Sequence, residues 1–171
     1  MRLCIASQIR INDFQTIHGK AYSESEKISE LVDYLCLLSY NDLNEFHSTK
    51  ITILGLYFKK DTDDVRESPF IFLIQKLLEL GVDLHIHNPV ARLPSNLDKI
   101  VNFHSTLEEC TLDTDAAVLM TDWKDYETLG IGNLPKNARG KVLIDDRRLF
   151  TQSEISEGVV YHALGPSHNS Y

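Results

Sequence analysis

Three basic side chains lie close together in one short, highly charged segment. Lys59, Lys60 and Arg66 follow an apolar run and precede Ser68-Pro69, a pair that typically opens a helix. The N–H groups of a helix N-terminus attract anions, and lysine and arginine add charged donors, so this pattern indicates a site for a phosphate-bearing ligand. A second interpretation is a solvated loop in which the bases pair with neighbouring acids, and composition alone favours it. Those acids are Asp61, Asp63, Asp64 and Glu67.

The segment lacks the glycine-rich turn with which a dinucleotide-binding fold holds a pyrophosphate. Gly55 is the only glycine in the preceding apolar run, and the next apolar run ends in Asn88 instead of an acid. Side chains would therefore have to hold a phosphate here, because the backbone cannot do so in the usual way.

Cysteine and histidine give weaker signals. Cys4, Cys36 and Cys110 are far apart, without zinc or disulfide spacing, and we expect three inert thiols. His85 and His87 share one face of a predicted strand, but no third ligand follows at a convincing spacing. We therefore expect neither a catalytic residue nor a metal site in this chain.

The elements that position these residues alternate between strand and helix. Apolar β-rich runs predict strands at 51–57, 82–87, 100–103, 116–120, 142–144 and 159–163, and helical spacing predicts helices at 69–80, 106–112 and 123–129. This alternation is typical of an α/β fold: a three-layer αβα, Rossmann-like domain with a mostly parallel sheet. Ligands of such sheets bind beyond the carboxyl ends of the strands, where the charged segment lies.

The first 48 residues differ from the rest. An amphipathic helix is predicted at 24–40, with one apolar stripe that could pack on the chain's own core or form a dimer interface. We expect this helical segment (1–48) to precede one domain (49–171). The net charge of −8 argues against a nucleic-acid partner, and no run is long and apolar enough to span a membrane, so we expect a cytoplasmic protein.

Several motifs in order resemble one family, the UDP-glucose/GDP-mannose dehydrogenases. The charged segment and its strand (ITILGLYFKKDTDDVRESP, 51–69) resemble the opening of the carboxy-terminal domain of these enzymes. Four shorter matches follow in the same order, namely HIHNP (85–89), AAVLMTDWKDY (116–126), VLIDDRRLF (142–150) and YHALG (161–165). Upstream, INDFQ (11–15) resembles the end of the central helix that joins the two halves and builds the dimer.

This resemblance implies roles for four residues. Phe58, Lys59 and Arg147 match positions that contact the UDP-sugar, and Arg66 matches a position that reaches an NAD held mainly by another domain. The reaction implied is the NAD-dependent oxidation of a sugar alcohol to a carboxylate, the UDP-uronate, through a thiol-bound intermediate.

The chain also departs from the family. Asp146 stands where the family has glycine, Asn88 where it has aspartate, and neither the NAD-binding domain nor its cysteine segment is present. We therefore expect a UDP-sugar-binding domain that is inactive without a dehydrogenase half, which another chain could supply, and that could form a homodimer. The alternative is an interaction module that has lost ligand binding.

Overall fold

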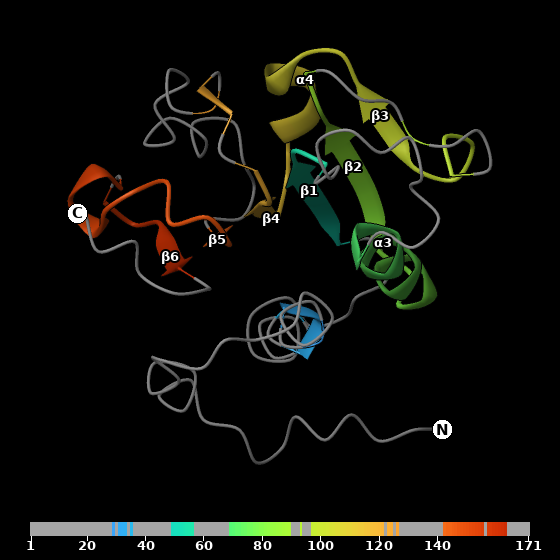
Figure 1. The fold of residues 1–171 in the computed structure, drawn as a ribbon, viewed down its shortest axis with the longest axis horizontal. Helices are drawn as coiled ribbons and strands as arrows, with labels where there is room; N and C mark the ends of the chain where they lie inside the picture. Colours follow the sequence, from blue (N-terminus) through green and yellow to red (C-terminus); the bar gives the residue numbers. More distant parts are fainter. Residues whose placement is uncertain are drawn as a thin grey trace.

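The computed structural model describes residues 29, 31–33, 35, 49–56, 69–89, 93, 97–121, 123–124, 126, 142–155 and 157–163. Figure 1 shows these residues as one sheet with helices packed against it. All statements below concern this part of the chain.

Six strands form a single sheet in the order β3-β2-β1-β4-β5-β6, and every neighbouring pair is parallel. The prediction of a Rossmann-like α/β domain is therefore confirmed, and the sheet is parallel throughout instead of only mostly so. The strands are β1 (Lys50–Leu54), β2 (Asp83–His87), β3 (Asn102–His104), β4 (Ala116–Leu119), β5 (Val142–Asp145) and β6 (Val160–Ala163).

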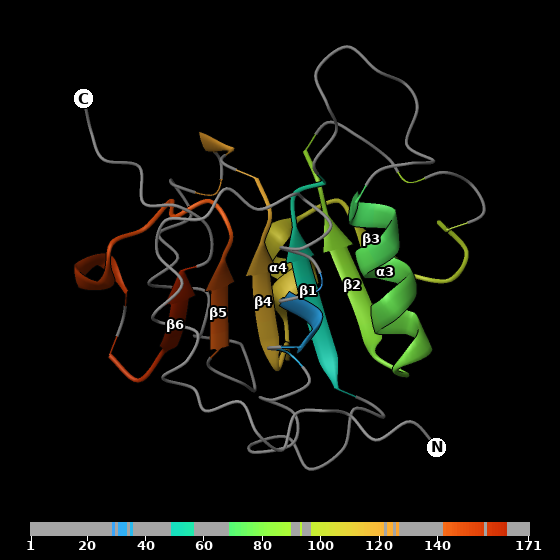
Figure 2. The same ribbon diagram turned by 60° about the horizontal axis from the view of Figure 1, so that its bottom comes forward.

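Helices lie on both faces of the sheet, which Figure 2 shows face-on (α3 in front, α4 behind). Helix α3 (Pro69–Glu79) starts at the predicted proline, and Gly81 follows it with a φ of +79°, a conformation that glycine adopts freely. Helix α4 (Leu107–Thr111) is capped by the Thr106 hydroxyl, which accepts a hydrogen bond from Glu109 N. A short 3-10 helix, η3 (Gln152–Glu154), was not predicted.

The first face of the sheet carries the main apolar core. Ile51 and Ile53 of β1 and Leu84 and Ile86 of β2 point to this face, because alternate residues of a strand share a side. They pack against α3 and against Leu31, Val32 and Leu35 of the helical residues that precede β1. Leu31 and Leu35 are each only 2% exposed there, so these two residues of the predicted stripe pack on the chain's own core.

The opposite face is more polar. It includes a second apolar cluster around Leu54, Leu119 and Leu143, which the fully buried Tyr126 covers. The polar residues of this face are Lys50, Thr52, Asp83, His85, His87, Asn102, His104, Asp145 and Tyr161. We call this the α4 face, since α4 packs beside β2 and β3.

Several predicted boundaries were wrong by one to three residues. Strand β1 ends at Leu54 instead of Tyr57, because Gly55 has a φ of +85° and leaves the extended conformation. The third strand was expected at 100–103 but is 102–104, since Ile100 belongs to a turn closed by its N–H donating to Leu97 O. The boundary between 48 and 49 stays a prediction.

Candidate functional site

The carboxyl ends of β1 and β4 mark the topological switch point of the sheet. From β1 the chain continues to β2 and β3 on one side, and then returns to β4 on the other side. Loops that leave two such strands in opposite directions open a crevice between them, and ligands of open α/β sheets bind there. The residues that follow β1, β2, β4 and β5 therefore form the candidate site.

Gly55, directly after β1, is packed against the residue that follows β4. A side chain at this position would place its Cβ 1.8 Å from Thr121 Oγ1, so only glycine fits. The Thr121 hydroxyl is itself buried and has no hydrogen-bond partner among the described residues. The two strand ends thus meet where the Gly55 backbone lies against the Thr121 side chain, whose hydroxyl donor is unsatisfied within the described residues.

The end of β2 fixes the backbone from which the charged segment starts. The N–H of Gly55 donates to the carbonyl of His87, and the N–H of Leu56 donates to the Asn88 side chain over 3.1 Å. Tyr126 donates its hydroxyl to the same His87 carbonyl and lies 3.1 Å from the ring Nδ1 of His87. Asn88 therefore has a structural role that an aspartate could also perform, because its oxygen is an acceptor here.

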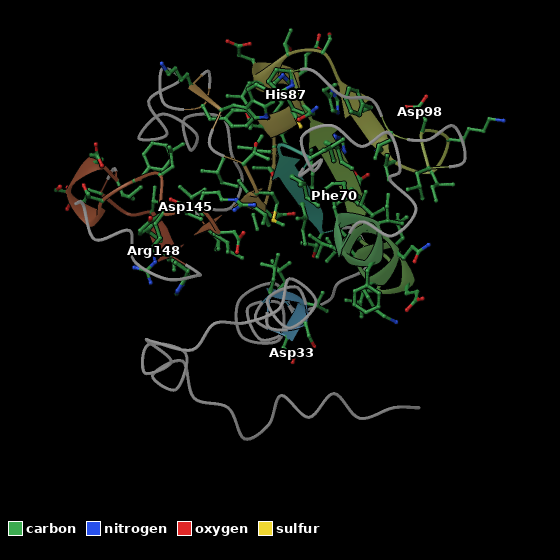
Figure 3. All side chains as sticks on the ribbon, in the orientation of Figure 1. Asp33, Phe70, His87, Asp98, Asp145 and Arg148 are labelled. Carbon is green, nitrogen blue, oxygen red and sulfur yellow. The ribbon has the colours of Figure 1, made fainter. Side chains whose placement is uncertain are left out.

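The end of β5 is organised by a fully buried carboxylate. Asp145 accepts hydrogen bonds from the N–H of Arg147 (2.9 Å), the N–H of Phe150 (3.1 Å) and the hydroxyl of Tyr161 (2.9 Å). Burial, and then the charge of Asp145, raise the pKa of Tyr161, so its hydroxyl remains a donor. Arg148 has a φ of +51°, and Figure 3 shows it beside Asp145. Asp145 thus fixes the turn that presents Arg147.

Arg147 lies across the end of β4, next to the switch point. Its Nε donates to the carbonyl of Met120 over 2.9 Å and lies 3.8 Å from Asp146 Oδ2. The N–H of Asp146 donates to Leu119 O and so continues the sheet ladder by one residue. The only residue of the predicted site that the structure describes is therefore at the crevice where ligands of this fold bind.

The other predicted site residues, Phe58, Lys59 and Arg66, are outside the described residues. So are Lys60, Cys4 and Cys36. Leu56 is the last described residue before the charged segment, and its N–H is fixed by Asn88. The segment therefore starts at the end of β1, on the same edge of the sheet as Arg147.

Cys110 is buried, and its burial raises the pKa of its thiol to about 12, so a thiolate is not available at neutral pH. This burial supports the expectation of an inert thiol at Cys110. Within the described part of the chain, no three side chains of the metal-binding types are grouped closely enough to hold a metal ion.

His85 and His87 have separate partners. The ring Nδ1 of His85 lies 2.7 Å from Nε2 of His104, with the two rings stacked, and its Nε2 lies 3.2 Å from Asp83. Burial lowers the pKa of both His85 and His104, although the hydrogen bond that His85 makes to the Asp83 carboxylate opposes this for His85. This cluster belongs to the β2–β3 side of the α4 face.

The described residues do not fit the pyrophosphate of a dinucleotide such as NAD. Such a ligand needs open glycine backbone after β1, whereas the space beside Gly55 is filled by Thr121. Asn88, at the position where an acid would bind a ribose, uses its oxygen to hold Leu56.

Sequence reasoning missed Thr121, Asp145 and Tyr161. Asp145 could have been identified as the acid that ends an apolar run, at a strand end on the binding edge. Thr121 and Tyr161 gave no such signal, because their roles depend on contacts with Gly55 and Asp145 that are remote in sequence.

Among the described residues, no helix is long and apolar enough to cross a membrane.

Solved structures of sugar-nucleotide dehydrogenases share the fold. A UDP-glucose dehydrogenase from Pyrobaculum islandicum is 26% identical, with a TM-score of 0.58 over 81% of this chain and 29% of that one. A UDP-D-ManNAc dehydrogenase from Pyrococcus horikoshii is 22% identical, with a TM-score of 0.63 over 81% and 31% of the two chains.

Curated relatives match at the sequence level. The UDP-glucose 6-dehydrogenase TuaD of Bacillus subtilis is 31% identical over 118 residues, which are 67% of this chain and 26% of that protein. A UDP-glucose 6-dehydrogenase of Rickettsia bellii is 28% identical over 170 residues, or 95% and 38% of the two chains. The chain thus spans only about a quarter to two fifths of the length of these relatives.

The family description that matches residues 52–152 is "UDP-glucose/GDP-mannose dehydrogenase family, UDP binding domain". This range includes both strand ends of the switch point, the charged segment, and the turn of Asp145 and Arg147. The chain therefore belongs to the UDP-glucose/GDP-mannose dehydrogenase family, as its carboxy-terminal UDP-binding domain.

Proposed function

We propose that the chain binds the UDP part of a UDP-sugar at the carboxyl edge of β1, β4 and β5. The observation that carries this proposal is the position of Arg147, whose guanidinium is held across the end of β4 by Met120 O. A cation at this place can bind a phosphate or a sugar oxygen of a ligand in the crevice. Phe58 and Lys59, at the start of the charged segment, supply the other contacts.

The oxidation itself belongs to a second, NAD-binding half, either elsewhere in a longer protein or on a separate chain. The described residues do not fit a dinucleotide pyrophosphate, and the buried Cys110 thiol does not ionise near neutral pH. Arg66 is the residue that would face the NAD of that half. The whole enzyme would convert a UDP-sugar to the UDP-uronate in the cytoplasm, whereas this domain alone would hold the substrate.

Isothermal titration with UDP and UDP-glucose tests the binding. We expect Arg147→Ala and Lys59→Ala each to weaken UDP binding at least tenfold, because a charge-assisted contact to a phosphate is lost. Lys99→Ala is the matched control, since it removes the same charge from the exposed turn before β3. No heat at millimolar UDP, or equal binding by all four proteins, would refute the proposal.

A second assay addresses the missing chemistry. The chain incubated with UDP-glucose and NAD should give no NADH absorbance at 340 nm. Steady NADH formation by the chain alone would show that it carries its own catalytic centre. That result would refute the proposal that a second, NAD-binding half performs the oxidation.

A further inference from the structure

The partner of Arg147 at the candidate site is an acid of the same turn. Asp146 Oδ2 lies 3.8 Å from Arg147 Nε, and the two side chains are only 5% and 22% exposed. Water screens such a pair weakly, so the attraction between the two charges exceeds that of a surface ion pair. The guanidinium that would receive a ligand anion therefore already has a counter-ion.

The protein backbone fixes this pair. The N–H of Asp146 donates to Leu119 O, and the N–H of Arg147 donates to Asp145 Oδ1. At the same time Arg147 Nε donates to Met120 O. These three hydrogen bonds hold both residues at the strand end, so the carboxylate cannot move far when a ligand arrives.

We infer that Asp146 is an internal counter-ion of Arg147 that selects the ligand of this site. An anion that approaches Arg147 also meets the Asp146 carboxylate and is repelled by it. A ligand that offers a hydroxyl donor beside its anionic oxygens can give that donor to Asp146 and its anion to Arg147. Asp146 therefore disfavours bare phosphate and pyrophosphate relative to a nucleotide sugar, which has ribose and sugar hydroxyls next to its phosphates. This inference rests on the proposed function, because it concerns the same site.

The test measures inorganic pyrophosphate and UDP-glucose in parallel, by isothermal titration at one fixed ionic strength. Asp146→Asn should bind pyrophosphate about tenfold more tightly than the parent, because the repulsion is removed. UDP-glucose should gain much less, because the amide oxygen accepts the hydroxyl of the ligand more weakly than the carboxylate does. Asp98→Asn makes the same change in net charge on the other side of the molecule (Figure 3) and should leave both affinities unchanged. Asp146→Ser is a second variant that also keeps the backbone N–H, in case the asparagine perturbs the turn.

The double variant Asp146→Asn, Arg147→Ala should lose the gain in pyrophosphate binding, because the effect acts through the guanidinium. The inference would be overturned if neither Asp146→Asn nor Asp146→Ser binds pyrophosphate more tightly than the parent. An equal improvement in Asp98→Asn would also overturn it. UDP-glucose binding in the same experiment would still support the proposed function. Conversely, a gain for pyrophosphate without any UDP-glucose binding would support the counter-ion and refute the nucleotide-sugar site.

Discussion

The two ends of the parallel sheet use their polar groups differently. At the amino end, the N–H of Lys50 donates to the Asp115 carboxylate and the N–H of Asp115 donates to Lys50 O. The Lys50 ammonium donates to Leu112 O. The Thr114 hydroxyl lies within hydrogen-bonding distance of two carbonyl oxygens, those of Lys50 (3.2 Å) and Ala116 (2.9 Å). These polar groups hold the ends of β1 and β4 together.

The carboxyl end of the same two strands is organised less completely. The Thr121 hydroxyl is buried without a hydrogen-bond partner in the described part of the chain, whereas the Thr114 hydroxyl at the amino end lies within reach of two acceptors. Positive φ values occur at both ends, at Gly55 and Arg148 after β1 and β5 and at Gly81 and Asp113 before β2 and β4. The difference therefore lies in the buried polar groups: an unsatisfied group reduces stability, and a ligand-binding site is one place where such a group is retained.

The largest difference between the two ends is expected from glycine substitutions. Gly55→Ala should lower the free energy of unfolding by about 4 kcal/mol, because its Cβ overlaps Thr121 in addition to the cost of a positive φ. Gly81→Ala, before β2 at the amino end, has a φ of +79° and should cost about 1–2 kcal/mol. Urea denaturation measures both, and equal losses would contradict the close contact at the switch point.

Removal of one acid at each end should separate stability from binding. Asp145→Ala leaves the N–H groups of Arg147 and Phe150 without their acceptor, while the Tyr161 hydroxyl keeps Phe150 O, and should cost about 3 kcal/mol. Asp115→Ala removes the acceptor of Lys50 N and should cost about 1–2 kcal/mol. Asp145→Ala should also weaken UDP binding, because this acid fixes the backbone of Arg147, and Asp115→Ala should not. Loss of UDP binding in both variants, measured by titration, would mean that it follows from general destabilisation.

Replacing each of two threonines with valine should change the stability of the fold in opposite directions. Thr121→Val removes a buried hydroxyl that has no partner among the described residues, and should stabilise the fold by about 1 kcal/mol. Thr114→Val removes hydrogen bonds at the amino end and should destabilise it by about 1–2 kcal/mol. Thermal unfolding with both variants decides this, and a destabilised Thr121→Val would show that the hydroxyl has a partner in the folded chain.

The smallest effect concerns the histidines between the two ends. Burial lowers the folded-state pKa of His85 and His104 below the ordinary 6.5, with Lys50 lowering it further and Asp83 and Glu109 opposing. The unfolded chain therefore takes up protons first when the pH falls below about 6.5. Stability is complete above this pH and is lost as the pH falls toward the lowered pKa values.

A double variant isolates this contribution from that of His162, whose pKa is also lowered by burial. His85→Asn with His104→Asn should show a smaller fall in melting temperature between pH 7 and pH 5 than the parent. A fall of the same size in both proteins would assign the pH dependence to groups outside this pair.

The order of the elements and the chemistry of the family were readable from the sequence. Apolar runs such as 51–54 and 116–119 predict buried parallel strands, and the Pro69 and Gly81 signals mark a helix correctly. Arg147 was predicted as a site residue from the motif around it, and its role in binding stays a prediction. These features are local, because a strand period, a helix boundary or a short motif depends only on neighbouring residues.

The tertiary structure alone decided which residues meet at the site. The order of the strands places β4 beside β1, and this brings Thr121 against Gly55 and Arg147 across Met120 O. The same strand order places Tyr161 beside Asp145 and His104 beside His85. The sequence by itself thus determined the fold class and the order of the elements, since both follow from local patterns. The partners of these polar groups across the sheet were decided only by folding. Arg147 and Met120, Asp145 and Tyr161, and His85 and His104 are each 16 or more residues apart in the sequence.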